Sequence, residues 1–321
     1  MMYNMDKLYE AVAERGHVCV GLDTAPEYIP EKELAATTPA EAVLAFNKAI
    51  IDASIDIAAC FKVQIAYYEE MGLAGLKAYA QTLKYIRERK ALVITDIKRS
   101  DIADTASRYA RAHFEGDFEA DFVTLSPYLG MDSLEPWLEW ADKKGKGAFV
   151  LMRTSNKGRH DFQLLPLGGG STPLASAAAN AGSSATPPRL FNAVGDRLSE
   201  LAASHRGIYG YGAFGAVVGI DSHSEDERRD AVEIRSKRAD LFFLIPGYGA
   251  QGGAASDAAL LLAPNGNGGI VNASRSILLA WKKFAERENR EAASITLNEV
   301  SLAAREAAID MRDAILDAVK K

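Results

Sequence analysis

The segment ALVITDIKRSDIADT, residues 91–105, joins an apolar stretch to a run of alternating charges. Its first part, ALVITDI, has the length and apolar character of a buried strand, and DIADTASRYA after it begins a helical pattern. Asp96 and Lys98 therefore stand where the strand ends and the helix has not yet begun. A strand followed by a helix is the repeating unit of α/β folds, so this segment indicates the fold class.

The same unit recurs along the chain. Apolar strands that alternate with helices predict a parallel sheet covered on both faces. Eight units favour a closed (β/α)8 TIM barrel, and an open doubly wound sheet is the alternative, because the pattern does not reveal closure. The eight expected strands are HVCVGLD (17–23), IAACFKV (57–63), ALVITDI (91–97), DFVTLS (121–126), GAFVLMR (147–153), GAVVGI (215–220), LFFLIP (241–246) and GIVNAS (269–274).

We expect one barrel domain over residues 1–321, with three additions. The start, MMYNMDKLYEAVAERGH, predicts a short amphipathic helix, and ITLNEVSLAAREAAIDMRDAILDAVKK predicts a long one that packs on the barrel exterior. The connection after the fifth strand is longer than one helix requires. Within it, at about 160–190, residues 168–188 are rich in Gly, Ala, Ser and Pro and have few large apolar side chains. We expect a surface insert there, without a chemical role.

The composition excludes several classes of function. With 48% hydrophobic and 25% charged residues the chain is typical of soluble globular proteins, and a net charge of −6 argues against broad nucleic-acid binding. A small anionic substrate stays possible. The sequence contains no 18-residue apolar run and begins without the pattern of a signal peptide, so we expect a cytoplasmic protein that does not bind membranes. Cys19 and Cys60 lie in apolar segments, as buried free thiols do.

Charged residues gather at the ends of the expected strands, where TIM barrels hold their catalytic groups. Side chains alternate along a strand, so Asp96 and Lys98 should point to the same side, with Lys62 at the end of the neighbouring strand. A purely structural ion-pair network is the alternative, and Asp101 could simply cap its helix. We favour a functional site, because charges in a poorly solvated barrel mouth are costly unless opposite signs pair. Further polar strand ends are Asp23, Ser126, Ser155, 247–253 and 272–275.

A glycine-rich run, IPGYGAQGG at 245–253, follows the seventh strand. Its spacing includes GxGxxG, but a dinucleotide site also requires an acidic residue at the end of the next strand, which has none. The loops after strands seven and eight of a TIM barrel commonly bind phosphate. Backbone amides at Gly249 and Gly252, with side-chain donors from Gln251 and Arg275, therefore predict a phosphate site.

Metal and nucleophilic-serine chemistry find no support in the sequence. It contains neither HExxH nor GxSxG, and its histidines do not pair at metal-ligand spacing. We therefore expect neither a histidine metal site nor a serine nucleophile. The five histidines are residues 17, 113, 160, 205 and 223.

These segments together resemble the orotidine 5'-phosphate decarboxylases. DIKRSDIADT fits the family's DxKxxDI(x)xT signature, and the other matching segments occur in family order over most of the chain. The length of the chain and its segments FKVQIAYYEE and RTSN most resemble those of the longer, second bacterial branch of the family. The other segments are GLD (21–23), FKVQIAYYE (61–69), LMRTSNKG (151–158), PGYGAQGG (246–253) and VNASRSI (271–277).

The resemblance implies a metal-free, cofactor-free barrel that acts as a homodimer with shared active sites. Such an enzyme converts orotidine 5'-monophosphate (OMP) to UMP and CO2, the last step of de novo pyrimidine biosynthesis. By the same resemblance Lys98 protonates C6 beside Asp96, and Lys62 joins the charged array and contacts the ribose. Asp101 and Thr105 would serve the partner's site. The remaining implied contacts are Asp23 to the ribose, Ser155 or its neighbour Asn156 to the pyrimidine, and Gln251 and Arg275 to the phosphate.

Two other functions stay open. A related DxKxxD barrel could act on a sugar phosphate with Mg²⁺, but this needs another carboxylate near the end of the second strand, where Lys62 and Gln64 stand. A non-catalytic UMP-binding regulator would need the phosphate and ribose contacts but not the Asp–Lys–Asp array.

Overall fold

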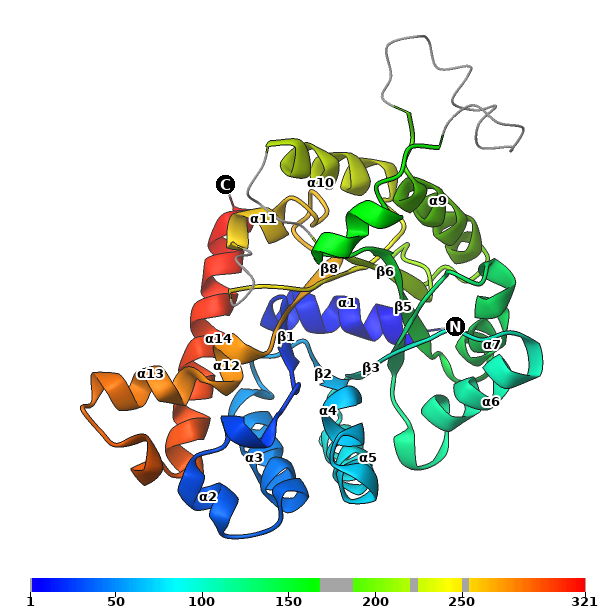
Figure 1. The fold of residues 1–321 in the computed structure, drawn as a ribbon. Helices are drawn as coiled ribbons and strands as arrows, with labels where there is room; N and C mark the ends of the chain where they lie inside the picture. The colour runs from blue at the N-terminus through cyan, green and yellow to red at the C-terminus, as the bar shows by residue number, and fades with distance from the viewer. Residues whose placement is uncertain (1, 168–186, 220–224, 250–253, 321) are drawn as a thin grey trace.

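The computed structural model describes residues 2–167, 187–219, 225–249 and 254–320. Its centre is a closed barrel of eight parallel strands in sequential order (Figure 1). Strand β1 pairs with both β2 and β8, so the sheet closes on itself and the open-sheet alternative was wrong. The strands are β1 (Val18–Gly21), β2 (Cys60–Gln64), β3 (Val93–Arg99), β4 (Phe122–Leu125), β5 (Gly147–Arg153), β6 (Phe214–Val218), β7 (Phe243–Ile245) and β8 (Gly269–Ala273).

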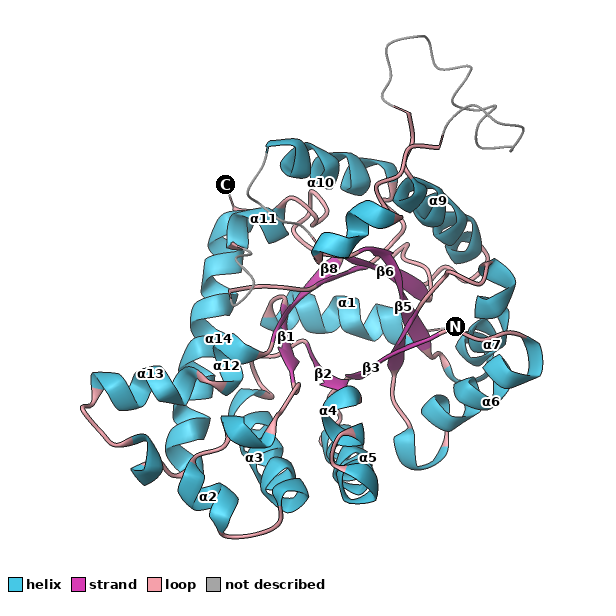
Figure 2. Cartoon of the chain, in the orientation of Figure 1, coloured by secondary structure: helices cyan, strands magenta, loops and turns pink. Residues whose placement is uncertain are grey.

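Helices enclose this barrel on the outside (Figure 2). Apart from α1, they follow strands in the sequence, and the longer ones bury one face against the barrel. The helices are α1 (Asn4–Arg15), α2 (Glu31–Ala35), α3 (Pro39–Ser54), α4 (Ala66–Glu69), α5 (Gly72–Glu88), α6 (Ala103–Phe114), α7 (Glu135–Lys144), α9 (Leu190–Ala203), α10 (Glu225–Lys237), α11 (Ala255–Ala259), α12 (Arg275–Leu278), α13 (Ala280–Arg287) and α14 (Leu297–Val319). Short 3-10 turns are η1 (Pro26–Tyr28), η2 (Gly116–Phe118), η3 (Met131–Leu134), η4 (Lys157–Asp161) and η5 (Ala292–Ser294).

Local signals explain where individual helices begin. At α3, Thr38 precedes the first turn, Pro39 is the first helical residue, and the backbone N–H of Thr38 donates to Glu41 Oε2 at 3.2 Å. Proline suits this position because its missing N–H would have no partner there, and the glutamate satisfies the N–H of the residue before it. The long helix α14 begins in the same way at Thr296.

The N-terminal helix α1 closes one end of the barrel. Its residues bond to segments that precede strands: Asn4 Nδ2 donates to Asp121 Oδ1 before β4 at 3.1 Å, and Asn267 Nδ2 before β8 donates to Tyr9 O at 3.1 Å. His17 also lies at this end, with Nε2 2.6 Å from Gly266 O. The strands' carboxyl ends therefore face the opposite way, and the mouth of the barrel lies there.

The long helix α14 packs on the barrel exterior against α3, as predicted. Arg305 Nη1 donates to Asp56 Oδ1 at 2.6 Å, just beyond the end of α3, and Ala304, Ala308 and Met311 are buried. Within the described part of the chain, no helix is long and apolar enough to cross a membrane.

The predicted insert at 168–188 lies outside the described residues, except for its last two positions. The residues on either side of it are paired with each other. Leu167 N donates to Pro188 O at 2.8 Å, and Pro166 forms an antiparallel bridge with Arg189. The two described ends of this connection therefore lie side by side, between β5 and α9. Elsewhere, Cys19 and Cys60 are buried free thiols, as predicted.

Candidate active site

A cavity of about 400 Å³ occupies the mouth of the barrel, a volume within the range of ligand sites. All eight strands contribute to it, directly or through the residues that follow them. One wall is charged and polar, and the other is formed by apolar side chains of β5 to β7. Its lining residues are Asp23, Tyr28, Lys62, Gln64, Tyr67, Asp96, Lys98, Thr124, Leu151, Thr154, Ser155, Asn156, Val217, Leu244, Pro246, Gly247, Tyr248, Asn272, Ser274 and Arg275.

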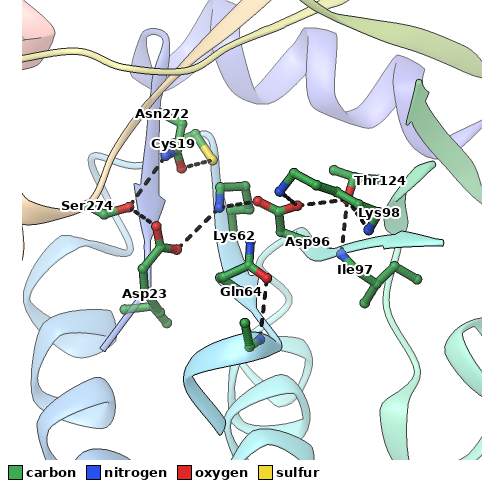
Figure 3. Close-up of polar contacts among 12 residues, drawn as sticks. Cys19, Asp23, Lys62, Gln64, Asp96, Ile97, Lys98, Thr124, Asn272 and Ser274 are labelled. Atoms are coloured by element: carbon green, nitrogen blue, oxygen red, sulfur yellow. Dashed lines mark hydrogen bonds and ion pairs between the residues drawn. The ribbon is translucent and has the colours of Figure 1, made fainter. Parts of the chain in front are cut away.

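Four charges of alternating sign form a row on the polar wall (Figure 3). Lys62 Nζ lies 3.3 Å from Asp23 Oδ1 and 2.8 Å from Asp96 Oδ2, and Lys98 Nζ lies 2.6 Å from Asp96 Oδ1. Lys62 is 4% exposed and Asp96 7%, whereas 48% of the Lys98 side chain is exposed. The charges at three strand ends are thus brought together, and the terminal lysine is the most exposed member of the row.

The alternating charges keep the two buried members of the row, Asp96 and Lys62, ionised. Burial by itself would raise the pKa of Asp96, but the ammonium groups of Lys62 and Lys98 outweigh it and hold the pKa of this carboxyl well below its usual range. Burial would lower the pKa of Lys62, and the carboxylates of Asp23 and Asp96 instead raise that pKa above its ordinary value. At neutral pH Asp96 and Lys62 therefore form a charged pair, carboxylate and ammonium, inside the barrel.

A bulge in β3 carries Lys98 into the site. Between the pairs Thr95–Val123 and Arg99–Leu125, three residues of β3 stand opposite a single residue of β4. Lys98 has φ +43°, in the left-handed region that residues other than glycine rarely adopt. Regular alternation predicted that Asp96 and Lys98 share a face. Their side chains do meet, but through this irregular backbone rather than through a regular pleat.

The single residue opposite the bulge is Thr124, which the sequence analysis missed. Its Oγ1 accepts from the backbone N–H groups of Ile97 and Lys98, both at 3.0 Å, and donates to Asp96 Oδ1 at 2.8 Å. A threonine inside an apolar strand resembles an ordinary core residue, so its only signal was its place beside the strand end. Ser126, which we had considered, lies beyond β4 and is not among the cavity-lining residues.

Asp23 is held from the side of β8. Ser274 Oγ donates to Asp23 Oδ2 at 2.9 Å, and Asn272 Nδ2 lies 3.5 Å from Ser274 Oγ. A Cβ at Gly21 would stand 2.0 Å from Ser274 Oγ, so this glycine makes room for the contact. The carboxylate is thereby fixed between a hydroxyl and the Lys62 ammonium, with one edge toward the cavity.

The segment after β5 forms a further wall. Ser155 and Asn156 both line the cavity, so the choice between them stays a prediction. Two arginines and a glutamate hold this segment in place. Arg159 Nη1 donates to Ser155 O at 2.8 Å. Glu227 of α10 accepts from Arg159 Nη2 at 2.8 Å and from the buried Arg153 Nη2 at 2.5 Å. This network fixes the backbone that carries the polar side chains.

The predicted phosphate side is described in part. Arg275, at the start of α12, lines the cavity. Among the described residues, no carboxylate forms an ion pair with its guanidinium group. Gly247 (φ +94°) and Gly249 (φ +71°) both adopt the left-handed backbone that glycine permits. Gln251 and Gly252 lie outside the described residues.

Asp101 and Thr105 do not reach the cavity of their own chain. Asp101 Oδ1 accepts from the N–H of Ile102 at 2.9 Å, and Thr105 is exposed on α6. Large apolar side chains are exposed on the neighbouring loops, and the rings of Tyr128 and Phe162 lie 6.5 Å apart. We call these four the rim patch: Ile102 (54% exposed), Tyr128 (80%), Leu129 (47%) and Phe162 (58%).

The described residues hold no group of three or more His, Cys, Asp or Glu side chains placed to bind a metal ion. Near the end of β2, where a Mg²⁺-dependent relative would need a carboxylate, the cavity is lined by Lys62 and Gln64. Lysine is cationic and glutamine is neutral, so neither side chain supplies the additional anionic ligand that Mg²⁺ would need.

Comparison with known proteins gives a consistent result. Residues 16–288 match a family model described as "Orotidine 5'-phosphate decarboxylase / HUMPS family". The chain is 49% identical over 317 residues to an orotidine 5'-phosphate decarboxylase of Clostridium perfringens (strain SM101 / Type A), covering 98% of this chain and 99% of that protein. A protein of the same name from Clostridium tetani is 48% identical over 316 residues, with 98% of both chains covered. The solved structure of Leishmania donovani OMP decarboxylase matches with a TM-score of 0.71 and 28% identity, covering 100% of both chains.

Proposed function

Because this chain belongs to the orotidine 5'-phosphate decarboxylase / HUMPS family, we propose that it is a carboxy-lyase that converts OMP to UMP and CO2 with the charged row in the barrel mouth. The observation that carries the proposal is the alternation of Asp23, Lys62, Asp96 and Lys98 along one wall of the cavity. A site that only bound a nucleotide would have no use for a buried carboxylate between two lysines.

The chemistry that such a row can perform follows from the charge that decarboxylation creates. When the bond between C6 and the carboxylate breaks, CO2 leaves and the electron pair stays on C6. The pair lies in the plane of the pyrimidine ring, where the π system cannot delocalise it, so a fixed positive charge beside C6 must stabilise it. The Lys98 ammonium, half exposed at the end of the row, supplies this charge and then donates its proton to C6.

Asp96 has a different role in this proposal. Its carboxylate stays ionised and would lie beside the carboxylate of OMP, which is repelled before cleavage, whereas departing CO2 is neutral. Lys62 holds Asp96 from the buried side and, with Asp23, is placed to contact the ribose hydroxyls. The two lysines therefore have separate tasks, one structural and ribose-binding, the other chemical.

The rest of the substrate would be held by the remaining walls. Ser155 or Asn156 would contact the pyrimidine, and Arg275 would bind the phosphate together with the backbone at Gly249, Gln251 and Gly252. A planar guanidinium can bind two phosphate oxygens at once. The phosphate is remote from C6, so its binding energy can be used to position the ring at the reacting groups.

Replacing Arg275 with alanine is expected to lower kcat/KM for OMP about 100-fold, mostly through a higher KM, because a charge-assisted contact to the phosphate is lost. Steady-state kinetics on the purified variant measure this. Arg197→Ala, which removes an exposed arginine of α9 paired with Glu200, is the control and should match the unaltered protein. An unchanged KM for Arg275→Ala would remove this residue from the phosphate site.

We also propose a homodimer in which each subunit completes the other's site. Asp101 and Thr105 belong to the same signature as Lys98 yet do not line their own cavity. The rim patch beside them offers exposed apolar surface of the kind that subunit interfaces bury. A cytoplasmic location belongs to the same proposal, supported by two free thiols on neighbouring strands.

The decisive test of the reaction is turnover of OMP with and without EDTA. Purified protein is expected to convert OMP to UMP at the same rate in both samples. The decrease of the orotate-type absorbance measures this rate. Activity that EDTA destroys would instead indicate a Mg²⁺-dependent barrel. Tight binding of UMP without any turnover would indicate a regulator.

A further inference from the structure

The β3 bulge leaves two backbone amides without a backbone acceptor on β4. Ile97 N–H and Lys98 N–H both point at the Oγ1 of Thr124, at 3.0 Å each. Thr124 is 1% exposed, so water does not replace this acceptor. A buried N–H without a partner is strongly unfavourable, and here one hydroxyl satisfies two of them.

This arrangement also fixes where the hydroxyl proton points. A threonine oxygen has two lone pairs and one proton. With both lone pairs occupied by the amides, the proton is directed to Asp96 Oδ1, 2.8 Å away. The same oxygen of Asp96 accepts from Lys98 Nζ at 2.6 Å. One hydroxyl thus contacts the backbone of Lys98 and the carboxylate to which the Lys98 side chain is bound.

We propose that Thr124 is a positioning residue for the decarboxylation. It holds Lys98 in its left-handed backbone conformation and orients the Asp96 carboxylate, so that the ammonium group is fixed where C6 will lie. The inference rests on the proposed function of Lys98 and Asp96. Reaction rates are sensitive to misplacement of a reacting group by about 1 Å, so this hydroxyl should affect the chemical step.

The effect should fall on kcat and leave substrate binding nearly unchanged. The proposed phosphate and ribose ligands, Arg275 and Asp23, are attached to β8 and β1 and make no recorded contact with Thr124. Lost hydrogen bonds at the bulge would let Lys98 and Asp96 shift without moving those ligands. A residue that merely filled the core would change stability but would not separate kcat from KM.

Two matched pairs of variants isolate the hydroxyl. Thr124→Val replaces it with a methyl group of similar size, and Thr124→Ser and Thr124→Ala differ from each other only by the oxygen. We expect kcat to fall about 10- to 100-fold in Thr124→Val relative to the unaltered protein, and by a similar factor in Thr124→Ala relative to Thr124→Ser. KM for OMP and the Kd for UMP should change less than about threefold, and Thr124→Ser should keep most of the activity.

Thr95→Val is the control, because Thr95 is equally buried on β3 but its hydroxyl donates to Phe122 O at 3.3 Å and not to the charged row. It should retain its kcat. The inference is overturned if either hydroxyl-deleting pair shows equal kcat, or if kcat falls only together with UMP binding. If Thr124→Val does not fold, the Ser and Ala pair decides alone. Absence of OMP turnover in the unaltered protein would contradict the proposed function instead, so the two failures are distinguishable.

Discussion

Replacing Lys98 with alanine is expected to abolish OMP decarboxylation, with kcat at least about 10⁴-fold lower. The substitution removes the charge that stabilises the carbanion and the proton that completes the reaction. The fold should survive, because Asp96 keeps its other partner, Lys62, at 2.8 Å. Single-turnover assays with excess enzyme measure the residual rate, and calorimetric binding of UMP confirms that the cavity is intact.

Two further variants sharpen this result. Lys98→Arg keeps a positive charge but has a group that does not release its proton near neutral pH, so it should also be inactive. Lys143→Ala removes an exposed lysine of α7 paired with Glu139 and should be fully active. Turnover by Lys98→Ala within about tenfold of the unaltered enzyme would exclude Lys98 as the proton donor, since general acids typically contribute more than that.

Asp101→Ala is expected to lower kcat/KM at least about 100-fold, even though Asp101 makes no recorded contact with its own cavity, because it would remove a charge from the partner's site. Mixing this variant with Lys98→Ala should restore activity. A hybrid dimer carries one site with both residues intact and one with both replaced. Random exchange between equal amounts should therefore recover about one quarter of the unaltered activity, as closed twofold symmetry requires.

The mixing experiment separates a shared site from a local one. If both residues acted within one subunit, the mixture would be no more active than its separate components. Asp104→Ala is the matched control, because Asp104 is an exposed acid three residues further along, in the first turn of α6, and pairs with Arg108. It should be active alone and should show no gain on mixing.

The sequence predicted much of the fold because strands and helices are specified locally. Each of the eight expected apolar runs overlaps an observed strand, and the neighbouring order of β2 and β3 made the meeting of Lys62 and Asp96 predictable. The bulge was not predictable in this way. Alternation assumes a regular pleat, and the left-handed conformation of Lys98 depends on what faces it from β4.

Residues whose role depends on partners distant in the sequence were not predicted for the same reason. Thr124 has the sequence context of a core residue, and only its position opposite the bulge makes it the acceptor for two amides. Ser274 belonged to a polar strand end, but its contact with Asp23 joins residues at opposite ends of the chain. Hydrogen bonds between strands that are distant in sequence leave no local pattern.

The burial of the charged row also restricts how the site can evolve. Lys62 and Asp96 are almost wholly enclosed, so loss of one leaves the other with a single remaining partner, Asp23 or Lys98, at a cost of up to roughly 3–5 kcal/mol. A change of that size is a large part of a typical domain's stability. Single mutations at Lys62 or Asp96 therefore lower stability, whatever activity they gain. A descendant with a different chemistry would need compensating substitutions at two strand ends at once, while the half-exposed position of Lys98 is the one from which gradual innovation can begin.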